Sequence, residues 1–445
     1  MDTKIDLKSE SNQESKLGFW SSSALVVGNM IGSGIFLLPA TLAVYGGISL
    51  LGWVFAAVGA ILMALVFGEL GRLAPETTGG PYAYTKISLG EFPAYLVAWS
   101  YWISIWCTNA AIAVALVSYL TVFIPTLGQS PVAAVLTGLS VIWFLTWTNS
   151  KRIRTVGFVQ LITTILKLVP ILMIGLVGIF YFKAENFPSF NLTGDSNFFV
   201  FTAVTTLIFF AFLGMESATI PGSKIKNAET TIKKSTIAGT IVTAAVYLLS
   251  TVAIMGILPH ETLATSNAPF ADAAQVFWGD YAKYIVAAGA VISTFGALNG
   301  WILLQGQIPL SAAQDKLFPK IFGKLNVNGS PAMGLVLSSI LATILMALNY
   351  AKSLVDAFAF MLLLSTLSVL APFIFSTASY VLESYKRKER NLPGKILLGV
   401  LAFGFCLWVM AGSGEEVVFW GFLLLMAGIP FYVWMKLAGP ELSAE

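Results

Sequence analysis

The sequence predicts an all-α integral membrane protein of about twelve transmembrane helices, and its composition and its apolar segments predict this fold class. Of the 445 residues, 57% are hydrophobic and only 11% are charged, whereas soluble proteins carry roughly 25% charged residues. Apolar stretches of about 20 residues, long enough to cross a bilayer, recur along the whole chain. A surface of this composition suits lipid and excludes an ordinary water-soluble domain.

The predicted spans follow one another with only short polar connections, so residues 18–438 form a single predicted transmembrane domain. Short cytoplasmic tails, 1–17 and 439–445, are expected to flank it. The twelve spans lie near residues 18–46, 48–70, 88–120, 130–148, 155–182, 197–221, 231–257, 278–311, 331–349, 354–382, 394–412 and 417–438.

The basic residues predict the orientation. An even number of spans leaves both termini on one face, and 21 of the 25 Lys and Arg residues fall on that face. Only Lys183, Lys283 and Lys352 fall on the opposite face, and Lys167 lies within a span. By the positive-inside rule both termini are cytoplasmic in a multi-pass cell-membrane protein. The same basic clusters could alternatively bind anionic lipid head groups.

Residues typical of metal or thiol chemistry are sparse. Cys107 and Cys406 both lie inside apolar stretches, and the single histidine, His260, has no ligand partners at metal-binding spacing. No catalytic constellation is visible, so neither an enzyme nor a metal or other cofactor is expected. No nucleic-acid partner is expected either.

The first span is interrupted near its middle. Asn29 is followed by Gly32, Ser33 and Gly34, and Gly-Ser-Gly is a poor helix former. Small residues in a membrane helix can simply let two helices pack closely. The alternative is an unwound hinge whose free N–H groups and helix N-terminus bind a carboxylate, as in the broken helices of secondary transporters.

A matching interruption occurs five spans later, where Gly214 is followed by Met215 and Glu216. Breaks in spans one and six are the spacing expected of two inverted five-helix repeats, since an odd-numbered repeat turns its second copy upside down. The predicted repeats cover about 18–182 and 197–382, and two extra helices occupy about 394–438.

Two ionisable side chains lie inside predicted spans, where a charge is costly unless it is paired or hydrated. Glu216 could be held by neighbouring donors for structural reasons alone, or it could sense protons or gate the substrate. Lys167 could tether helices by donating to carbonyl groups of the broken first span. It could also carry a proton if desolvation lowers its pKa.

Four motifs give the chain a family resemblance: Gly-Ser-Gly-Ile-Phe-Leu-Leu-Pro-Ala at 32–40, Gly-Gly-Pro-Tyr-Ala-Tyr at 79–84, Gly-Met-Glu-Ser-Ala at 214–218 and Gly-Trp at 300–301. With them the chain resembles the amino acid, polyamine and organocation transporter superfamily, particularly the bacterial arginine/agmatine and related diamine antiporters. The resemblance implies a five-plus-five inverted-repeat fold with two extra helices, alternating access around a central site and a possible homodimer.

The resemblance also implies roles for individual residues. Ser33 and the backbone of the first break would bind a substrate carboxylate, and the backbone near the second break would take the amino group. Asn109 and Trp301 match a polar residue and an aromatic residue of the antiporter site. Together the predicted substrate-binding residues are Asn29, Ile31, Gly32, Ser33, Gly34, Asn109, Phe210, Ala211, Leu213, Gly214, Trp301 and Ser365. The predicted gating or proton-sensing residues are Tyr82, Tyr101, Glu216 and Lys167.

Two residues depart from the diamine antiporters. Phe210 stands where their pattern has a tryptophan that closes over the substrate, and Lys167 resembles a lysine of permeases and exchangers for neutral amino acids. The leading hypothesis is therefore an amino acid antiporter of arginine/agmatine type, and the alternative is a proton-coupled or exchanging permease for neutral amino acids. An ion channel is the remaining rival, but no charged ring or repeated filter motif is visible.

Overall fold

The computed structural model describes residues 17–437, apart from 33, 76, 78, 152–167, 169–170, 221 and 223–224. Within these residues the chain is helical and has no sheet, the one isolated bridge pairing Leu17 with Ile225. The predicted all-α fold class is thus confirmed.

Ten segments in this part of the chain are long and apolar enough to cross a membrane. The shorter apolar helices 171–181 and α14 (Ala332–Leu348) accompany them, and a total of twelve spans remains a prediction. In chain order the ten segments are α1 (Phe19–Met30) with α2 (Gly34–Ala43), α3 (Ile48–Leu73), α5 (Glu91–Leu120), α7 (Pro131–Lys151), α9 (Asn197–Phe209) with η6 (Phe210–Phe212) and η7 (Met215–Thr219), α10 (Ala228–Ile257), α13 (Asp280–Gln314), α15 (Leu354–Lys386), α16 (Leu392–Ala411) and α17 (Glu415–Leu437).

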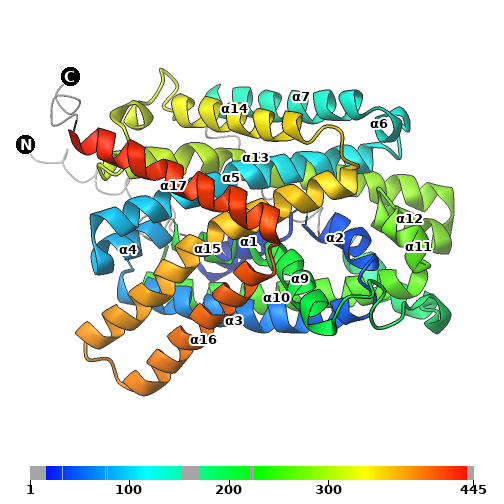
Figure 1. Ribbon diagram of the computed structural model, residues 1–445, viewed down its shortest axis with the longest axis horizontal. Helices are drawn as coiled ribbons and strands as arrows, with labels where there is room; N and C mark the ends of the chain where they lie inside the picture. Colours follow the sequence, from blue (N-terminus) through cyan, green and yellow to red (C-terminus); the bar gives the residue numbers. More distant parts are fainter. Residues whose placement is uncertain are drawn as a thin grey trace, which may run out of the picture.

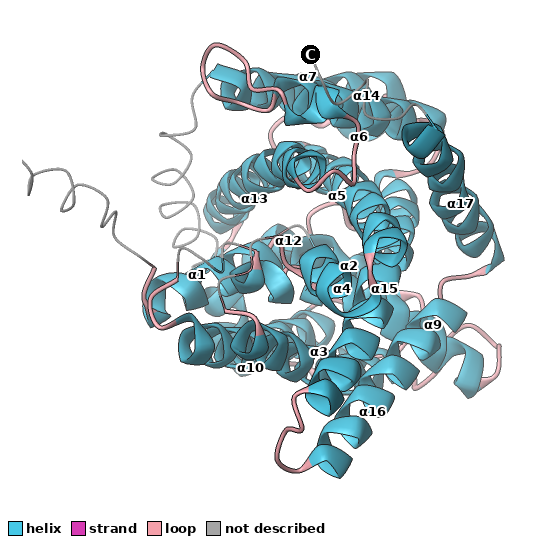
Figure 2. Ribbon diagram, turned by 90° about the vertical axis from the view of Figure 1, so that its left-hand side faces the viewer, coloured by secondary structure: helices cyan, strands magenta, loops and turns pink. Residues whose placement is uncertain are grey.

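The helices pair in a way that reflects an internal two-fold relation. The first four spans each pack against the span five positions later: α1 against η7, α3 against α10, α5 against α13, and α7 against α14. Figure 1 shows α7 and α14 lying side by side along one edge, and Figure 2 shows the same pair from the end. This is the pairing expected of two inverted repeats, whose counterparts face each other across a pseudo-two-fold axis.

Burial separates the central helices from the peripheral ones. The most apolar stretch of α5 is 94% buried and that of α1 with α2 is 88% buried, whereas that of α17 is 17% buried. In the end-on view α2 lies in the middle, with α5, α15 and α9 around it (Figure 2). Every residue of α2 is buried, including Pro39 within the helix. The broken first span therefore forms the core of the molecule.

Short helices mark the two ends of the molecule (Figure 1). The α4 end carries α4 (Pro81–Leu89), η9 (Lys320–Gly323) and the connection 387–391. The α11 end carries α6 (Thr126–Gln129), η4 (Ile179–Tyr181), η5 (Ala184–Asn186), α11 (His260–Ala264), α12 (Pro269–Trp278) and the connection 349–353. The third span was predicted to begin at residue 88, but Gly90 has a φ of 94° and separates α4 from α5 there.

An ion-pair network at the α4 end ties four segments together. The carboxylate of Glu69 on α3 accepts hydrogen bonds from Arg72 at 3.1 Å, Lys395 of α16 at 3.1 Å and Lys233 of α10. Glu389 pairs with Arg72 at 2.8 Å and with Lys395 at 3.2 Å. One carboxylate thus joins two helices of the inverted repeats to an extra helix.

Glu389 lies outside the spans, and its hydrogen bond from Arg72 holds the pKa of its carboxyl group below the ordinary value. A lowered carboxyl pKa stabilises the fold above the unfolded pKa, and this stability is lost as the pH falls through the lowered value. The link through Glu389 is therefore intact at neutral pH and weakens only in acid.

Replacing Glu69 by Gln should destabilise the protein by about 1–3 kcal/mol, because the amide removes the charge that three cations share. The side chain of Glu69 is only 12% exposed, so water replaces the lost contacts poorly. The measurement is the thermal unfolding midpoint in detergent. Glu91→Gln is the matched control, since Glu91 pairs with Lys436 while 46% exposed and should shift the midpoint much less. Equal shifts would contradict the assigned importance of the network.

Candidate functional site

The first helix break lies between α1 and α2. Helix α1 ends at Met30, and Ile31 leaves the helical region with φ −76° and ψ 83°. The carbonyl group of Met30 accepts a hydrogen bond from the hydroxyl group of Tyr247 on α10, at 2.6 Å. Ser33 lies outside the described residues. A backbone group freed by the break is thus satisfied by a neighbouring helix, as lipid surroundings require.

The second break lies between α9 and η7. The helix tightens at η6, Leu213 becomes extended, and Gly214 takes a φ of 102°. This left-handed conformation costs an L-residue roughly 1–2 kcal/mol but suits glycine. The chain therefore turns sharply at Gly214.

The two breaks touch each other. A β-carbon added at Gly214 would lie 3.0 Å from the backbone carbonyl carbon of Asn29, and one added at Gly34 would lie 3.2 Å from the Phe210 ring and 3.3 Å from the α-carbon of Ala211. Segments almost two hundred residues apart in sequence meet at backbone distance, which only glycine permits. The structure thus brings together five residues predicted from the sequence.

Glu216 connects the second break to α5. Its side chain is fully buried, and its two carboxylate oxygens accept hydrogen bonds from the hydroxyl group of Tyr101 at 2.7 Å and from the backbone N–H of Gly214 at 3.1 Å. The glutamate therefore holds the turn at Gly214 and ties it to α5.

Asn109 belongs to a polar chain across the core. Its amide nitrogen donates to the side-chain oxygen of Gln305 on α13 at 2.6 Å, and Gln305 donates in turn to Ser339 on α14 at 2.8 Å and to the carbonyl group of Leu335 at 3.0 Å. The amide oxygen of Asn109 is buried and has no hydrogen-bond partner among the described residues. The amide oxygen of Asn109 is thus a hydrogen-bond acceptor available inside the molecule.

Ser365 and Trp301 complete the buried surroundings. Ser365 on α15 donates to the carbonyl group of Ser104 at 2.9 Å and lies 2.6 Å from the hydroxyl group of Thr108, so it joins α15 to α5. Trp301 is 4% exposed and lies one turn beyond Ala297, whose β-carbon would be 3.6 Å from one added at Gly32. Helix α13 therefore faces the first break.

Comparison with known proteins identifies the family. The model of the amino acid permease family matches residues 17–438. The chain belongs to this family. It is a multi-pass membrane transporter of small amino acid or amine molecules, not an enzyme.

Several relatives cover nearly the whole chain of this permease. It is 31% identical to the putative arginine/ornithine antiporter of Bacillus subtilis (strain 168), over 94% of this chain and 97% of the relative. It is 31% identical to the cadaverine/lysine antiporter of Escherichia coli (strain K12), over 94% of both chains. It is 28% identical to the arginine/agmatine antiporter of Chlamydia abortus, over 94% of this chain and 89% of the relative.

The fold is shared with a solved structure of low sequence identity. The structure of MhsT in complex with L-phenylalanine superposes with a TM-score of 0.62 at 14% identity, over 88% of this chain and 98% of MhsT. The agreement extends across the core of the permease and bears out its inverted-repeat fold class.

Two of the predicted gating residues of the permease, Tyr101 and Tyr82, lie on different helices and have different neighbours. Tyr101 contacts Glu216 directly, whereas Tyr82 lies on α4, where its ring packs closely against Gly79. Burial, and then the carboxylate of Asp315, raise the pKa of Tyr82 well above its ordinary value, so its hydroxyl group stays protonated. Lys167 lies outside the described residues.

Three residues of the permease site were missed from the sequence: Tyr247, Gln305 and Phe358. Tyr247 holds the Met30 carbonyl group, Gln305 pairs with Asn109, and the Phe358 ring meets Phe210 edge-on at a centroid distance of 6.1 Å. A polar residue inside an apolar span was the available signal for Gln305, by the rule that identified Glu216. Phe358 carries no such signal.

Replacing Gly214 by Ala should reduce transport at least about tenfold, which corresponds to roughly 1.4 kcal/mol. Alanine opposes the positive φ and would push the second break away from Asn29. The measurement is the initial uptake rate per amount of monodisperse protein in proteoliposomes. Gly404→Ala on α16 is the matched control, because nothing lies within 4 Å of its added β-carbon. Wild-type uptake by the Gly214 variant would contradict the contact between the breaks.

Proposed function

We propose that this permease is an antiporter of arginine/agmatine type, which exchanges a cationic amino acid for another cationic amino acid or for its decarboxylated amine. The observation that carries the proposal is the near full-length similarity, at 31% identity, to antiporters for arginine and ornithine and for lysine and cadaverine. Exchange needs no covalent step. It requires a site whose occupancy allows the molecule to pass between two opposed states.

The two touching breaks support a substrate site at their junction. In this proposal Ser33 and the backbone at Ile31, Gly32 and Gly34 bind the substrate carboxylate, because a helix N-terminus presents free N–H groups and positive potential. Backbone carbonyl groups around Ala211 and Leu213 would take the amino group. Asn29 and Gly214 would hold the two breaks at the required distance.

The substrate side chain would lie among residues of the surrounding helices. The amide oxygen of Asn109, which has no partner in the described part of the chain, can accept a hydrogen bond from an ammonium or guanidinium group. Trp301 and Phe210 offer aromatic faces, which also attract cations. Ser365, which joins α15 to α5, would help to shape the pocket. These features favour a cationic substrate.

A neutral amino acid is the second candidate substrate. Phe210 presents a smaller ring than tryptophan, and Lys167, within a predicted span, could take the place of a bound cation or carry a proton. Both features favour a proton-coupled or exchanging permease for neutral amino acids. The transport assay below separates the two candidates.

The domain limits, the orientation and the assembly complete the proposal. One transporter domain would cover residues 18–438, with repeats at about 18–182 and 197–382, extra helices at about 394–438 and both tails in the cytoplasm. The α4 end would then face the cytoplasm, in keeping with the 21 to 3 distribution of basic residues. A homodimer is proposed on the family resemblance.

The transport assay uses purified protein in liposomes that are empty or preloaded with arginine, ornithine, lysine, agmatine, cadaverine or alanine. We expect labelled arginine to enter only preloaded vesicles, and a cationic internal substrate to be needed. Uptake of alanine or serine into empty vesicles, driven by external acid, would instead establish the neutral permease. Flux through wild-type protein that does not saturate with substrate would contradict both.

We further propose that Tyr101, Glu216 and Tyr82 gate the path toward the α4 end. The hydrogen bond between Tyr101 and Glu216 ties the second break to α5. Breaking it would let the break move and would open the site toward that end. Lys167, which the sequence places within a span, would take part in coupling.

Tyr101→Phe should therefore shift the population toward the open state by about five- to 150-fold, the equivalent of roughly 1–3 kcal/mol for one lost hydrogen bond to the Glu216 carboxyl group. A cysteine introduced in place of the buried Ala297 beside the first break reports the shift as faster labelling by a soluble maleimide. Native Cys107 and Cys406 are fully buried and give little background.

Tyr95→Phe is the matched control for this labelling. Tyr95 lies on the same helix and also loses one hydrogen bond, to the carbonyl group of Gly428 at 2.7 Å, but it is bonded to α17 and not to a break. Equal labelling rates in the two variants would contradict the proposed gating role of the hydrogen bond between Tyr101 and Glu216.

A further inference from the structure

A cavity lies between the two helix breaks and the α11 end. It has a volume of about 470 Å³ and is bounded by the outer half of α2, by α11 and by the start of α15. Cavities of roughly 300–1,000 Å³ are the size that small ligands occupy. Its polar lining includes Thr41, Tyr45, Thr265, Asn267 and Asp356.

The cavity lies directly outward of the first break. Ala40 and Thr41 line it, and Ala40 is six residues along α2 from Gly34, a rise of about 9 Å. Ala359 also lines it, and the neighbouring Phe358 meets Phe210 edge-on. The Phe210–Phe358 contact therefore stands between this cavity and the central site.

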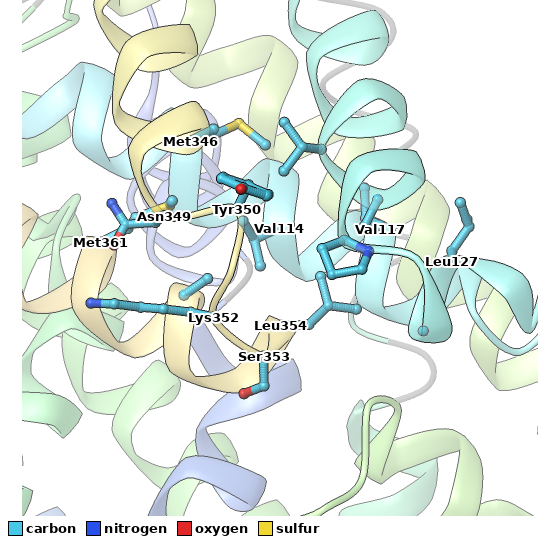
Figure 3. Close-up of a pocket in the computed structure, with 15 residues that line it drawn as sticks. Val114, Val117, Leu127, Met346, Asn349, Tyr350, Lys352, Ser353, Leu354 and Met361 are labelled. Carbon is cyan, nitrogen blue, oxygen red and sulfur yellow. The ribbon is translucent and has the colours of Figure 1, made fainter.

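Asp356 is the one charged side chain among the described residues that line the cavity. It is exposed and makes no ion pair within the described part of the chain; its carboxylate accepts a hydrogen bond from Ser353 at 2.6 Å. The nearest basic residue in sequence, Lys352, holds its ammonium group over the Phe360 ring at 4.1 Å. Figure 3 shows the Lys352 side chain running away from Leu127 and Val117, in the smaller apolar pocket that shares Ser353 and Leu354 with this cavity.

The protein surface on the same side as the cavity is negatively charged, as Asp356 is. The connections and helix starts on the side predicted to lie opposite the termini carry eight acidic side chains against three basic ones, which are Lys183, Lys283 and Lys352. Lys283 is already paired with Asp272 at 2.9 Å. The acidic residues are Glu185, Asp195, Glu261, Asp272, Asp280, Asp356, Glu415 and Glu416. A cavity with one unpaired carboxylate in a negative surface concentrates cations.

We propose that this cavity is an outer binding site for organic cations, in which Asp356 receives the ammonium or guanidinium group of the substrate before it reaches the breaks. The proposal rests on the proposed exchange of cationic substrates. A structural role competes with it: Ser353 caps the start of α15, its hydroxyl group accepting from the backbone N–H of Asp356 at 3.1 Å and donating to the Asp356 carboxylate. The test must separate charge from capping.

Asp356→Asn keeps an acceptor for the Ser353 hydroxyl group and removes only the charge. We expect the KM for external arginine to rise about fivefold at low ionic strength, the effect of a unit charge at contact distance in water, and the maximal exchange rate to stay unchanged. The increase should shrink in 0.5 M salt, since salt screens exposed charges. The measurement is arginine uptake into right-side-out membrane vesicles loaded with arginine.

Asp280→Asn is the matched control. Asp280 is also an acid in the first turn of a long helix at the α11 end, and it also accepts a side-chain hydrogen bond, from Gln275 at 2.7 Å. Asp280 does not line the cavity, so the KM of the Asp280→Asn variant for external arginine should stay near that of the wild type. An equal rise in both variants would reduce the effect to general surface charge and overturn the proposal.

A cysteine variant keeps the test decisive if the amide variant folds poorly. Asp356→Cys, modified with a negatively charged methanethiosulfonate reagent, should recover the wild-type KM, while a positively charged reagent should raise it further. A KM independent of the sign of the reagent would overturn the outer site alone. Wild-type vesicles that exchange no arginine would instead overturn the proposed function, and the outer site with it.

Discussion

The backbone of a membrane helix cannot be left unsatisfied in lipid, and the organisation of this protein follows from how it meets that constraint at two breaks. The carbonyl group of Met30 is satisfied by Tyr247, and the N–H group of Gly214 by Glu216. The hydroxyl group of Tyr119 on α5 also donates to the carbonyl group of Phe36 at 2.9 Å and so ties α2 to α5. Polar side chains on α10 and η7 therefore take up backbone groups that the breaks leave without a helical partner, which makes unwound backbone tolerable inside a membrane protein.

These contacts are of two kinds, which bears on how the molecule can move. The breaks meet each other through glycine at backbone distance, an apolar contact that neither segment can leave without opening a void. The second break meets α5 through one hydrogen bond between Glu216 and Tyr101, which water or substrate groups can replace. The two breaks are therefore expected to move as a unit while their polar contact with α5 is exchanged. A rigid pair of breaks against a fixed α5 is the arrangement that alternating access requires.

The sequence predicted the breaks because glycine next to polar residues inside an apolar span is a local signal. It also predicted Glu216, since an ionisable side chain within a membrane span is costly unless it has a function or a partner, whereas Asn109 was predicted only through the family resemblance. It could not predict that Asn109 would meet Gln305, because that hydrogen bond joins helices 196 residues apart and depends on how they are rotated. Phe358 was missed for a related reason: an apolar residue in an apolar span has no local mark, and only packing places it against Phe210. The end of α4 at Gly90 was overlooked although Gly90, followed by Glu91 and Pro93, is a local signal for a helix boundary.

Charge divides the two ends of the molecule in a way that basic residues alone do not reveal. At the α4 end the network around Glu69 absorbs Arg72, Lys233 and Lys395, so part of the positive bias that fixes orientation also holds helices together. At the α11 end most acidic residues have no such partner among the described residues, Asp272 with Lys283 being the exception. An unpaired acidic surface stabilises nothing by itself, and its self-repulsion is a cost. In a carrier of cations, as proposed above, the same negative potential would raise the local concentration of substrate at the mouth of the cavity beside Asp356.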